Sequence, residues 1–347
     1  MTSPVPPPAP RVNPKLVGHT QARAAFLQAW RTGRMAHAWI LAGPPGIGKA
    51  SLAFAMSRFV LEGGTRDALG TMREQDPVFR LVSAGSHPDL LTIERPMDAK
   101  GEHQKAEIPV DSVRQLGDFL SKATSRAGGW RVVIVDGAQS LNRHGQNALL
   151  KNLEEPPGRS LILLTTTHPQ SLLPTIRSRC RVLPLLPLTP AEMNEVLRGQ
   201  TDDLSPSDLS LMTALAQGAP GRLLALLEAG GPPLYHELMA CLAAPDQANR
   251  RLALAERCSG REGQEVFSVL MEWLAAWLGR LVMARVRQQP MLCLADEEAA
   301  AVQTLAAQST QTLLAVAESL RARAHEALGI NLDRKAVFLG ALGLVAS

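Results

Sequence analysis

The sequence predicts an α/β protein in which a parallel sheet with helices on both faces precedes a small helical region and an all-helical C-terminal part. Three observations carry this prediction. Short apolar runs alternate with helical segments up to residue 187. A glycine-rich turn at residues 43–48 joins one such run to a helix. Alanine and leucine dominate the second half of the chain, which favours helices there.

The elements expected in the sheet region are recognised by their residue patterns. Short apolar or β-branched runs predict strands, and apolar residues at helical spacing predict helices. Strands are expected at residues 37–43, 89–95, 131–137, 161–167 and 179–185. Helices are expected at residues 20–33, 49–61, 110–124 and 146–153. The run RVVIVDG at residues 131–137 is the clearest, because a strand that is covered on both faces is continuously apolar.

Beyond Pro190 the pattern changes to helices alone. Three short segments each begin with a capping residue or proline and end at a glycine, and a Gly-Gly-Pro-Pro stretch at residues 230–233 is a candidate linker. Longer Ala/Leu-rich helices follow, the last of which is expected to begin near Asn331. The predicted parts are a disordered Pro-rich leader, a sheet domain, a three-helix region and a helical C-terminal domain, at residues 1–14, 15–187, 188–230 and 231–347.

Composition limits the class of protein. Of the 347 residues, 46% are apolar and 20% charged, which is typical of a packed globular protein with two or three domains. The net charge of +4 is only a weak indication of a nucleic-acid partner. No apolar run is expected to reach the ~20 residues of a membrane span, and the N-terminus lacks the apolar core of a secretory signal. A cytoplasmic protein with no membrane partner is therefore predicted.

The cysteines argue against a disulfide framework and against zinc. The four cysteines are Cys180, Cys241, Cys258 and Cys293. They are scattered along the chain and form no C-x-x-C pair. We therefore expect no metal site built from these thiols.

The stretch GPPGIGKAS is close to the phosphate-loop pattern G-x-x-x-x-G-K-[ST]. A strand before it and a helix after it are the context that this pattern requires. Backbone N–H groups and a lysine would hold the phosphates of ATP or ADP, and the sequence leaves open which of the two. The candidate residues are Gly43, Pro44, Pro45, Gly46, Ile47, Gly48, Lys49, Ala50 and Ser51. The alternative is a tight structural turn, which leaves Lys49 unexplained.

Two parts needed for hydrolysis are missing from this site. A hydroxyl that binds Mg²⁺ should follow Lys49, but the residue is Ala50, and Ser51 comes one position late. The strand ending in Asp136 should be followed by a glutamate that polarises water, but the residue is Gly137. The sequence therefore predicts nucleotide binding without hydrolysis, with Mg²⁺ binding left open.

The string LLKNLEEPP at residues 149–157 and the string LILLTTTHPQSLLPTIRSRC at residues 161–180 resemble the bacterial replicative clamp loader of the AAA+ superfamily. The resemblance extends over residues 15–228. It implies an AAA+ phosphate-loop domain, a small helical lid and a collar domain that holds such subunits in a ring. The family's motor subunits carry an intact phosphate loop, an Asp-Glu pair and a four-cysteine zinc insert, none of which is present here. The resemblance thus implies the relatively rigid accessory subunit, and zinc is not expected.

The same resemblance assigns partners and individual residues. The implied partners are motor and delta-type subunits in a ring of five, the sliding clamp indirectly, and primed DNA. In the family the arginine of the Ser-Arg-Cys motif, here Arg179, reaches the γ-phosphate of ATP on a neighbouring subunit. Thr166 or Thr167, and Arg222, match positions that sense bound nucleotide. Each assignment has an alternative. Arg179 could be one of several arginines that alternate on an exposed strand edge. The threonine could be an ordinary strand residue, and Arg222 could lie at a solvent-facing helix start.

Two other functions stay open from the residues. An autonomous AAA+ motor acting on DNA, of the helicase-loader or branch-migration type, would need the hydroxyl and the base that Ala50 and Gly137 do not supply. A scaffold that binds no nucleotide would not need Lys49.

Overall fold

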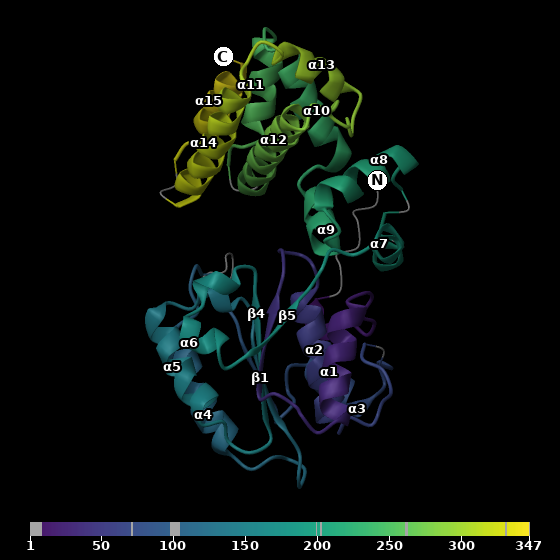
Figure 1. The fold of residues 1–347 in the computed structure, drawn as a ribbon, viewed down its shortest axis with the longest axis vertical. Helices are drawn as coiled ribbons and strands as arrows, with labels where there is room; N and C mark the ends of the chain where they lie inside the picture. Colours follow the sequence, from purple (N-terminus) through teal and green to yellow (C-terminus); the bar gives the residue numbers. More distant parts are fainter. Residues whose placement is uncertain are drawn as a thin grey trace. The chain divides into compact units, whose positions relative to one another are not determined.

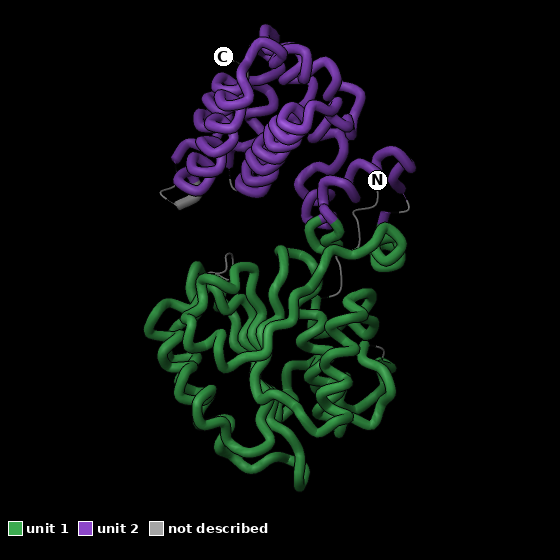
Figure 2. Tube along the Cα trace, in the orientation of Figure 1, with its two compact units in different colours: residues 1, 3–200, 218–222 green, residues 2, 201–217, 223–347 purple. Residues whose placement is uncertain are grey.

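The computed structural model describes residues 9–70, 72–97, 105–198, 200–201, 203–260, 263–329 and 332–346. The chain forms two compact units (Figure 2). Unit 1 takes its residues from 3–200 and 218–222, and unit 2 from 201–217 and 223–347. The expected lid helices are thus divided between the two units, and the limits of the three proposed modules stay a prediction.

Unit 1 is built on a five-stranded, all-parallel sheet in the order β2-β3-β4-β1-β5, which confirms the predicted α/β class. The strands are β1 (Ala38–Ala42), β2 (Leu90–Ile93), β3 (Arg131–Val135), β4 (Ser160–Thr166) and β5 (Arg181–Pro184). Each lies within one of the five predicted ranges or extends it by one residue. The central strands β1, β3 and β4 are fully buried.

Helices cover both faces of this sheet (Figure 1). One face carries α1 (Thr20–Arg31), α2 (Lys49–Leu61) and α3 (Pro77–Ser83), and the other carries α4 (Val110–Ser121), α5 (Arg143–Glu154) and α6 (Pro174–Arg177). Short 3-10 turns lie at η1 (Pro10–Val12), η2 (Ala138–Ser140) and η3 (Pro169–Ser171). The sequence patterns missed α3 and α6, because a helix of one or two turns is too short to show a periodicity.

The side chains of β1 divide between two apolar cores. Trp39 and Leu41 pack with α1 and α2, whereas Ala38 and Ile40 pack on the opposite face with α4 and α5. The same alternation runs through β3 and β4, because successive strand residues point to opposite faces. This alternation therefore determines which side chains at the ends of the strands lie on the face that α2 covers.

Part of the segment expected to be a disordered leader is ordered. Residues 1–8 lie outside the described residues, but η1 packs on α2 and α3. The side chain of Arg58, which is 2% exposed, donates to the carbonyls of Arg11 (3.1 Å) and Asn13 (2.8 Å). A buried guanidinium needs acceptors, and the leader carbonyls supply them. Burial lowers the pKa of Arg58 to about 10.

The helical C-terminal part is confirmed. Unit 2 contains α8 (Pro206–Ala216), α10 (Gly231–Ala243), α11 (Ala248–Glu256), α12 (Gly263–Val286), α13 (Glu297–Thr304), α14 (Thr310–Gly329) and α15 (Arg334–Ala346). Helix α7 (Pro190–Leu197) belongs to unit 1, and α9 (Pro220–Glu228) has residues in both units. The helix start expected near Asn331 falls outside the described residues.

Two expectations about this part were wrong. Residues 230–233 are no linker, because α10 begins at Gly231 and places its prolines in the first turn, where a missing N–H costs nothing. An apolar segment of membrane-spanning length also exists: the 24-residue α12 passes that test by length and composition. Its side chains Phe267, Trp273 and Trp277 are buried inside unit 2, so α12 is the core helix of that unit.

Candidate functional site

The glycine-rich turn lies at the carboxyl end of β1 and leads directly into α2. Gly46 (φ +73°) and Gly48 (φ +100°) adopt the left-handed conformation that favours glycine. Between them, the buried side chain of Ile47 anchors the turn in the core. The first turn of α2 leaves its N–H groups without intrahelical acceptors, and Leu52 donates the first helical bond, to the carbonyl of Gly48 (3.0 Å). The turn thus has the form of an anion-binding loop.

Lys49 folds back over this loop. Its half-buried ammonium donates to the carbonyls of Gly43 (2.9 Å) and Pro44 (2.7 Å). Burial lowers the pKa of Lys49 to about 8, although the nearby charge of Asp136 acts in the opposite direction. Lys49 and Asp136 therefore lie near each other, and their binding of nucleotide stays a prediction.

This pKa gives a testable pH dependence. Only the protonated ammonium attracts phosphate, so the affinity for ADP should be level below pH 8 and fall by up to roughly tenfold per pH unit above it. Titration calorimetry between pH 7.5 and 9.5 measures this, because the phosphates of ADP keep their charge there. Lys49→Arg, which stays charged, is the control, and an equal fall in that variant would refute the assignment to Lys49.

Thr165, which the sequence analysis overlooked, is the threonine that faces this site. Its hydroxyl donates to Asp136 Oδ1 (2.5 Å) and accepts the N–H of Gly137 (2.9 Å). Thr166 points to the other face of the sheet, where its hydroxyl accepts the N–H of His168 (3.1 Å). It meets the loop only through its backbone carbonyl, which accepts the N–H of Gly43 (3.2 Å). The strand alternation was the signal that distinguishes the two threonines.

The residues present do not fit the Mg²⁺ site of a phosphate-loop ATPase. Ala50 offers no oxygen, and Ser51 lies a further ~100° around α2. Gly137 has φ +77°, so a glutamate there would meet a strained backbone. In the described part of the chain, no cluster of three or more His, Cys, Asp or Glu side chains could hold a metal ion.

The segment 218–222 of unit 1 closes over the loop. The N–H of Gly221 donates to the carbonyl of Gly46 (2.9 Å), which places the backbone of Arg222 beside the loop. The ring of His19 makes a second contact, from Nε2 to the carbonyl of Ile47 (2.8 Å). Burial lowers the pKa of His19 below its usual value, so its neutral ring donates this bond. His19 followed no motif and was missed by the sequence analysis.

The close approach at Gly46 can be measured as stability. A Cβ on Gly46 would lie 2.4 Å from the backbone nitrogen of Arg222. We expect Gly46→Ala to lower the free energy of unfolding by about 2–4 kcal/mol, from the left-handed φ together with the steric overlap. Gly33→Ala is the matched control, since Gly33 has φ +66° but no atom within 4 Å of its Cβ position. Equal losses in urea denaturation would rule out the steric contribution.

Arg179 lies near the amino end of β5, and the phosphate loop lies at the carboxyl end of the neighbouring, parallel strand β1. It occupies the turn between α6 and β5, and β5 runs parallel to β1 with Arg181 beside Trp39. The loop begins at Gly43, at the carboxyl end of β1. At ~3.3 Å per residue, Gly43 lies about 13 Å along the strand from Trp39. Arg179 is exposed, so its guanidinium can meet a ligand held by another molecule but not by its own loop.

The three arginines of this segment do not alternate along one strand. Arg177 ends α6, Arg179 lies in the turn, and only Arg181 belongs to β5, where it covers the ring of Trp39. The alternative of an exposed strand edge is therefore wrong.

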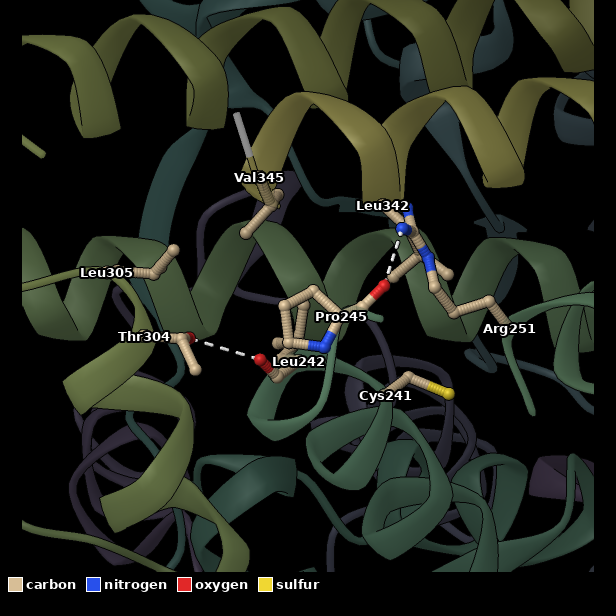
Figure 3. A pocket seen from close by; sticks show the side chains of 8 residues that line it. All are labelled: Cys241, Leu242, Pro245, Arg251, Thr304, Leu305, Leu342 and Val345. Carbon is tan, nitrogen blue, oxygen red and sulfur yellow. Dashed lines mark hydrogen bonds between the residues drawn. The ribbon is translucent and has the colours of Figure 1, made fainter. Parts of the chain in front are cut away.

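Unit 2 contains a separate, small cavity (Figure 3). Its volume of about 20 Å³ is enough for one water molecule, not for a nucleotide. Arg251 crosses one side of it and donates to the carbonyl of Pro245 (3.3 Å), and Thr304 donates to the carbonyl of Leu242 (3.1 Å). This cavity of unit 2 is therefore too small to be a nucleotide site.

Comparison with known proteins gives relatives that are subunits of DNA polymerase III. DNA polymerase III subunit delta' of Pseudomonas aeruginosa is 35% identical over 202 residues, which are 57% of this chain and 58% of that protein. DNA polymerase III subunit delta' of Escherichia coli is 34% identical over 205 residues, 58% of each chain. DNA polymerase III subunit tau of Salmonella typhimurium is 28% identical over 273 residues, 76% of this chain and 40% of that protein. The chain spans less than two thirds of the length of these relatives.

A family model described as "DNA polymerase III, delta subunit" matches residues 18–189. This range contains the phosphate loop, Asp136, Thr165 and Arg179, but it ends before Arg222 and before unit 2 begins. Residues 18–189, just under half of the chain, therefore match the DNA polymerase III delta-subunit family.

Proposed function

We propose that the chain is the delta-prime (stator) subunit of a DNA polymerase III clamp loader. In this role it assists ATP-dependent loading of the sliding clamp onto primed DNA and donates Arg179 in trans to ATP on a neighbouring subunit. The observation that carries the proposal is the place of Arg179: an exposed arginine at the amino ends of the parallel strands, whereas the protein's own loop lies at their carboxyl ends. An always-charged guanidinium stabilises the charge that develops on a transferred phosphoryl group.

The protein's own loop would hold nucleotide without hydrolysing it. The backbone of residues 43–51 and Lys49 would bind the phosphates of ATP or ADP, with Asp136, Thr165 and Arg222 beside them. Without a metal hydroxyl at position 50 and a base at position 137, the residues lack the means to activate water. This site would therefore stabilise the subunit rather than drive it, with ATPase activity weak or absent.

The partners follow from the same role. The similarity to both delta' and tau subunits supports a ring of five with motor and delta-type subunits. Such a ring would work in the cytoplasm and act on the sliding clamp through the other subunits. Contacts to primed DNA would be made to backbone phosphates, so they would weaken with salt and ignore sequence.

The alternative of an autonomous motor acting on DNA is not better supported, since it needs the two groups that Ala50 and Gly137 do not provide. The experiment that separates the two is clamp loading and ATP hydrolysis by a reconstituted assembly carrying Arg179→Ala. Loading at the unmodified rate would overturn the proposed function.

A further inference from the structure

We propose that Glu154, the last residue of α5, is the positioning residue of Arg179. The inference rests on the proposed function, because it concerns how the arginine is presented to a neighbour's ATP. Glu154 Oε1 lies 3.0 Å from the terminal nitrogen NH2 of Arg179. The other terminal nitrogen, NH1, donates to the carbonyl of Thr175 (3.1 Å). A guanidinium has five N–H donors, so two fixed contacts leave donors for phosphate oxygens.

The backbone that carries Arg179 is already fixed. The N–H of Arg179 donates to the carbonyl of Ile176 (3.1 Å), and the hydroxyl of Ser178 donates to the carbonyl of Thr175 (3.1 Å). Cys180 packs against the apolar core beneath the turn. Burial raises the pKa of the Cys180 thiol to about 12, so it stays protonated and acts as an apolar anchor. Only the long side chain of Arg179 then needs a contact from outside this turn to fix its orientation.

Helix α5 holds this segment at two separate points. Near its start, the buried Gln146 accepts the N–H of Leu173 (2.8 Å) and donates to the carbonyl of Ser171 (3.2 Å). At its end, Glu154 holds the tip of Arg179. The first contact fixes the loop that precedes α6, and the second fixes the functional group. Glu154 is therefore more than the last residue of α5, because its carboxylate also holds Arg179.

The expected effect is small, because both side chains are partly exposed, 37% for Arg179 and 48% for Glu154. A pair open to water holds a geometry only weakly. We expect Glu154→Ala to lower kcat for ATP hydrolysis at the neighbouring subunit's site by about threefold to fivefold, with KM unchanged. Glu154→Gln keeps the acceptor oxygen and should lose less. Glu155→Ala is the matched control, since Glu155 is the exposed neighbour that caps α5.

A double-mutant cycle makes the test decisive. If Glu154 acts through Arg179, then Glu154→Ala should have no further effect in a chain that already carries Arg179→Ala. An equal loss in both backgrounds would mean a merely structural role and would overturn the inference. So would a loss as large in Glu155→Ala, or no loss in Glu154→Ala where Arg179→Ala slows the assembly. If Arg179→Ala itself leaves hydrolysis unchanged, the proposed function fails first and the inference falls with it.

Discussion

Replacing Arg179 by alanine is expected to slow ATP hydrolysis at the neighbouring subunit by roughly 10³-fold or more, the usual worth of an arginine supplied in trans. The side chain is exposed and remote from its own loop, so its removal should leave the isolated protein as stable as before. Phosphate release by the reconstituted assembly measures the effect. The total rate of ATP hydrolysis by the ring should fall by the fraction that this one site contributes.

Two further variants isolate the chemistry of this arginine. Arg179→Lys keeps the charge but loses the planar fork of donors, so it should recover only part of the rate. Arg181→Ala removes the next arginine, which belongs to β5 and lies over the ring of Trp39 in β1, and this change should leave the turnover unaltered. If Arg181→Ala slowed hydrolysis as much as Arg179→Ala, a general loss of positive charge would explain both results, and the trans role would be refuted.

The parallel sheet could be predicted from the sequence because its signals are local. Helix α2 has the predicted bounds, residues 49–61, since an apolar run directly follows a glycine loop. Strand β3 is a continuous β-branched run that only a doubly covered strand explains. The same local signals bring Lys49 and Asp136 near each other, because the carboxyl ends of parallel strands meet at one edge of a sheet, and their role in one site stays a prediction.

What could not be predicted depends on contacts between distant residues. The choice of Thr165 over Thr166 required the face on which each side chain lies, and one residue of register reverses that face. The pair of Glu154 with Arg179 joins residues 25 positions apart, with no local pattern. At residues 230–233 the glycines and prolines looked like a linker, but prolines are equally suited to the first turn of a helix.

The second large effect is expected at Lys49, in the purified chain alone. The chain should bind ADP but show no turnover of ATP. Lys49→Ala should weaken ADP binding by roughly 10- to 100-fold, because a hydrogen bond to a charged group is worth about 1.5–3 kcal/mol. Titration calorimetry gives the affinity, and phosphate release gives the turnover. Ser51→Ala is the control: its hydroxyl lies one position beyond the place for a metal ligand, so its loss should leave both quantities unchanged.

Restoring the missing hydroxyl should not restore hydrolysis. Ala50→Thr supplies the oxygen, but the base is still absent. Gly137→Glu would put a side chain on a residue with φ +77°, a backbone conformation that costs roughly 1–2 kcal/mol for residues other than glycine. The variant carrying both changes should therefore remain at background turnover, because the backbone turn at residue 137 no longer suits a glutamate. Steady ATP hydrolysis by the unmodified chain, lost in Lys49→Ala, would contradict the stator role and favour an autonomous motor. Binding without turnover leaves Arg179 as the residue through which this protein contributes to catalysis.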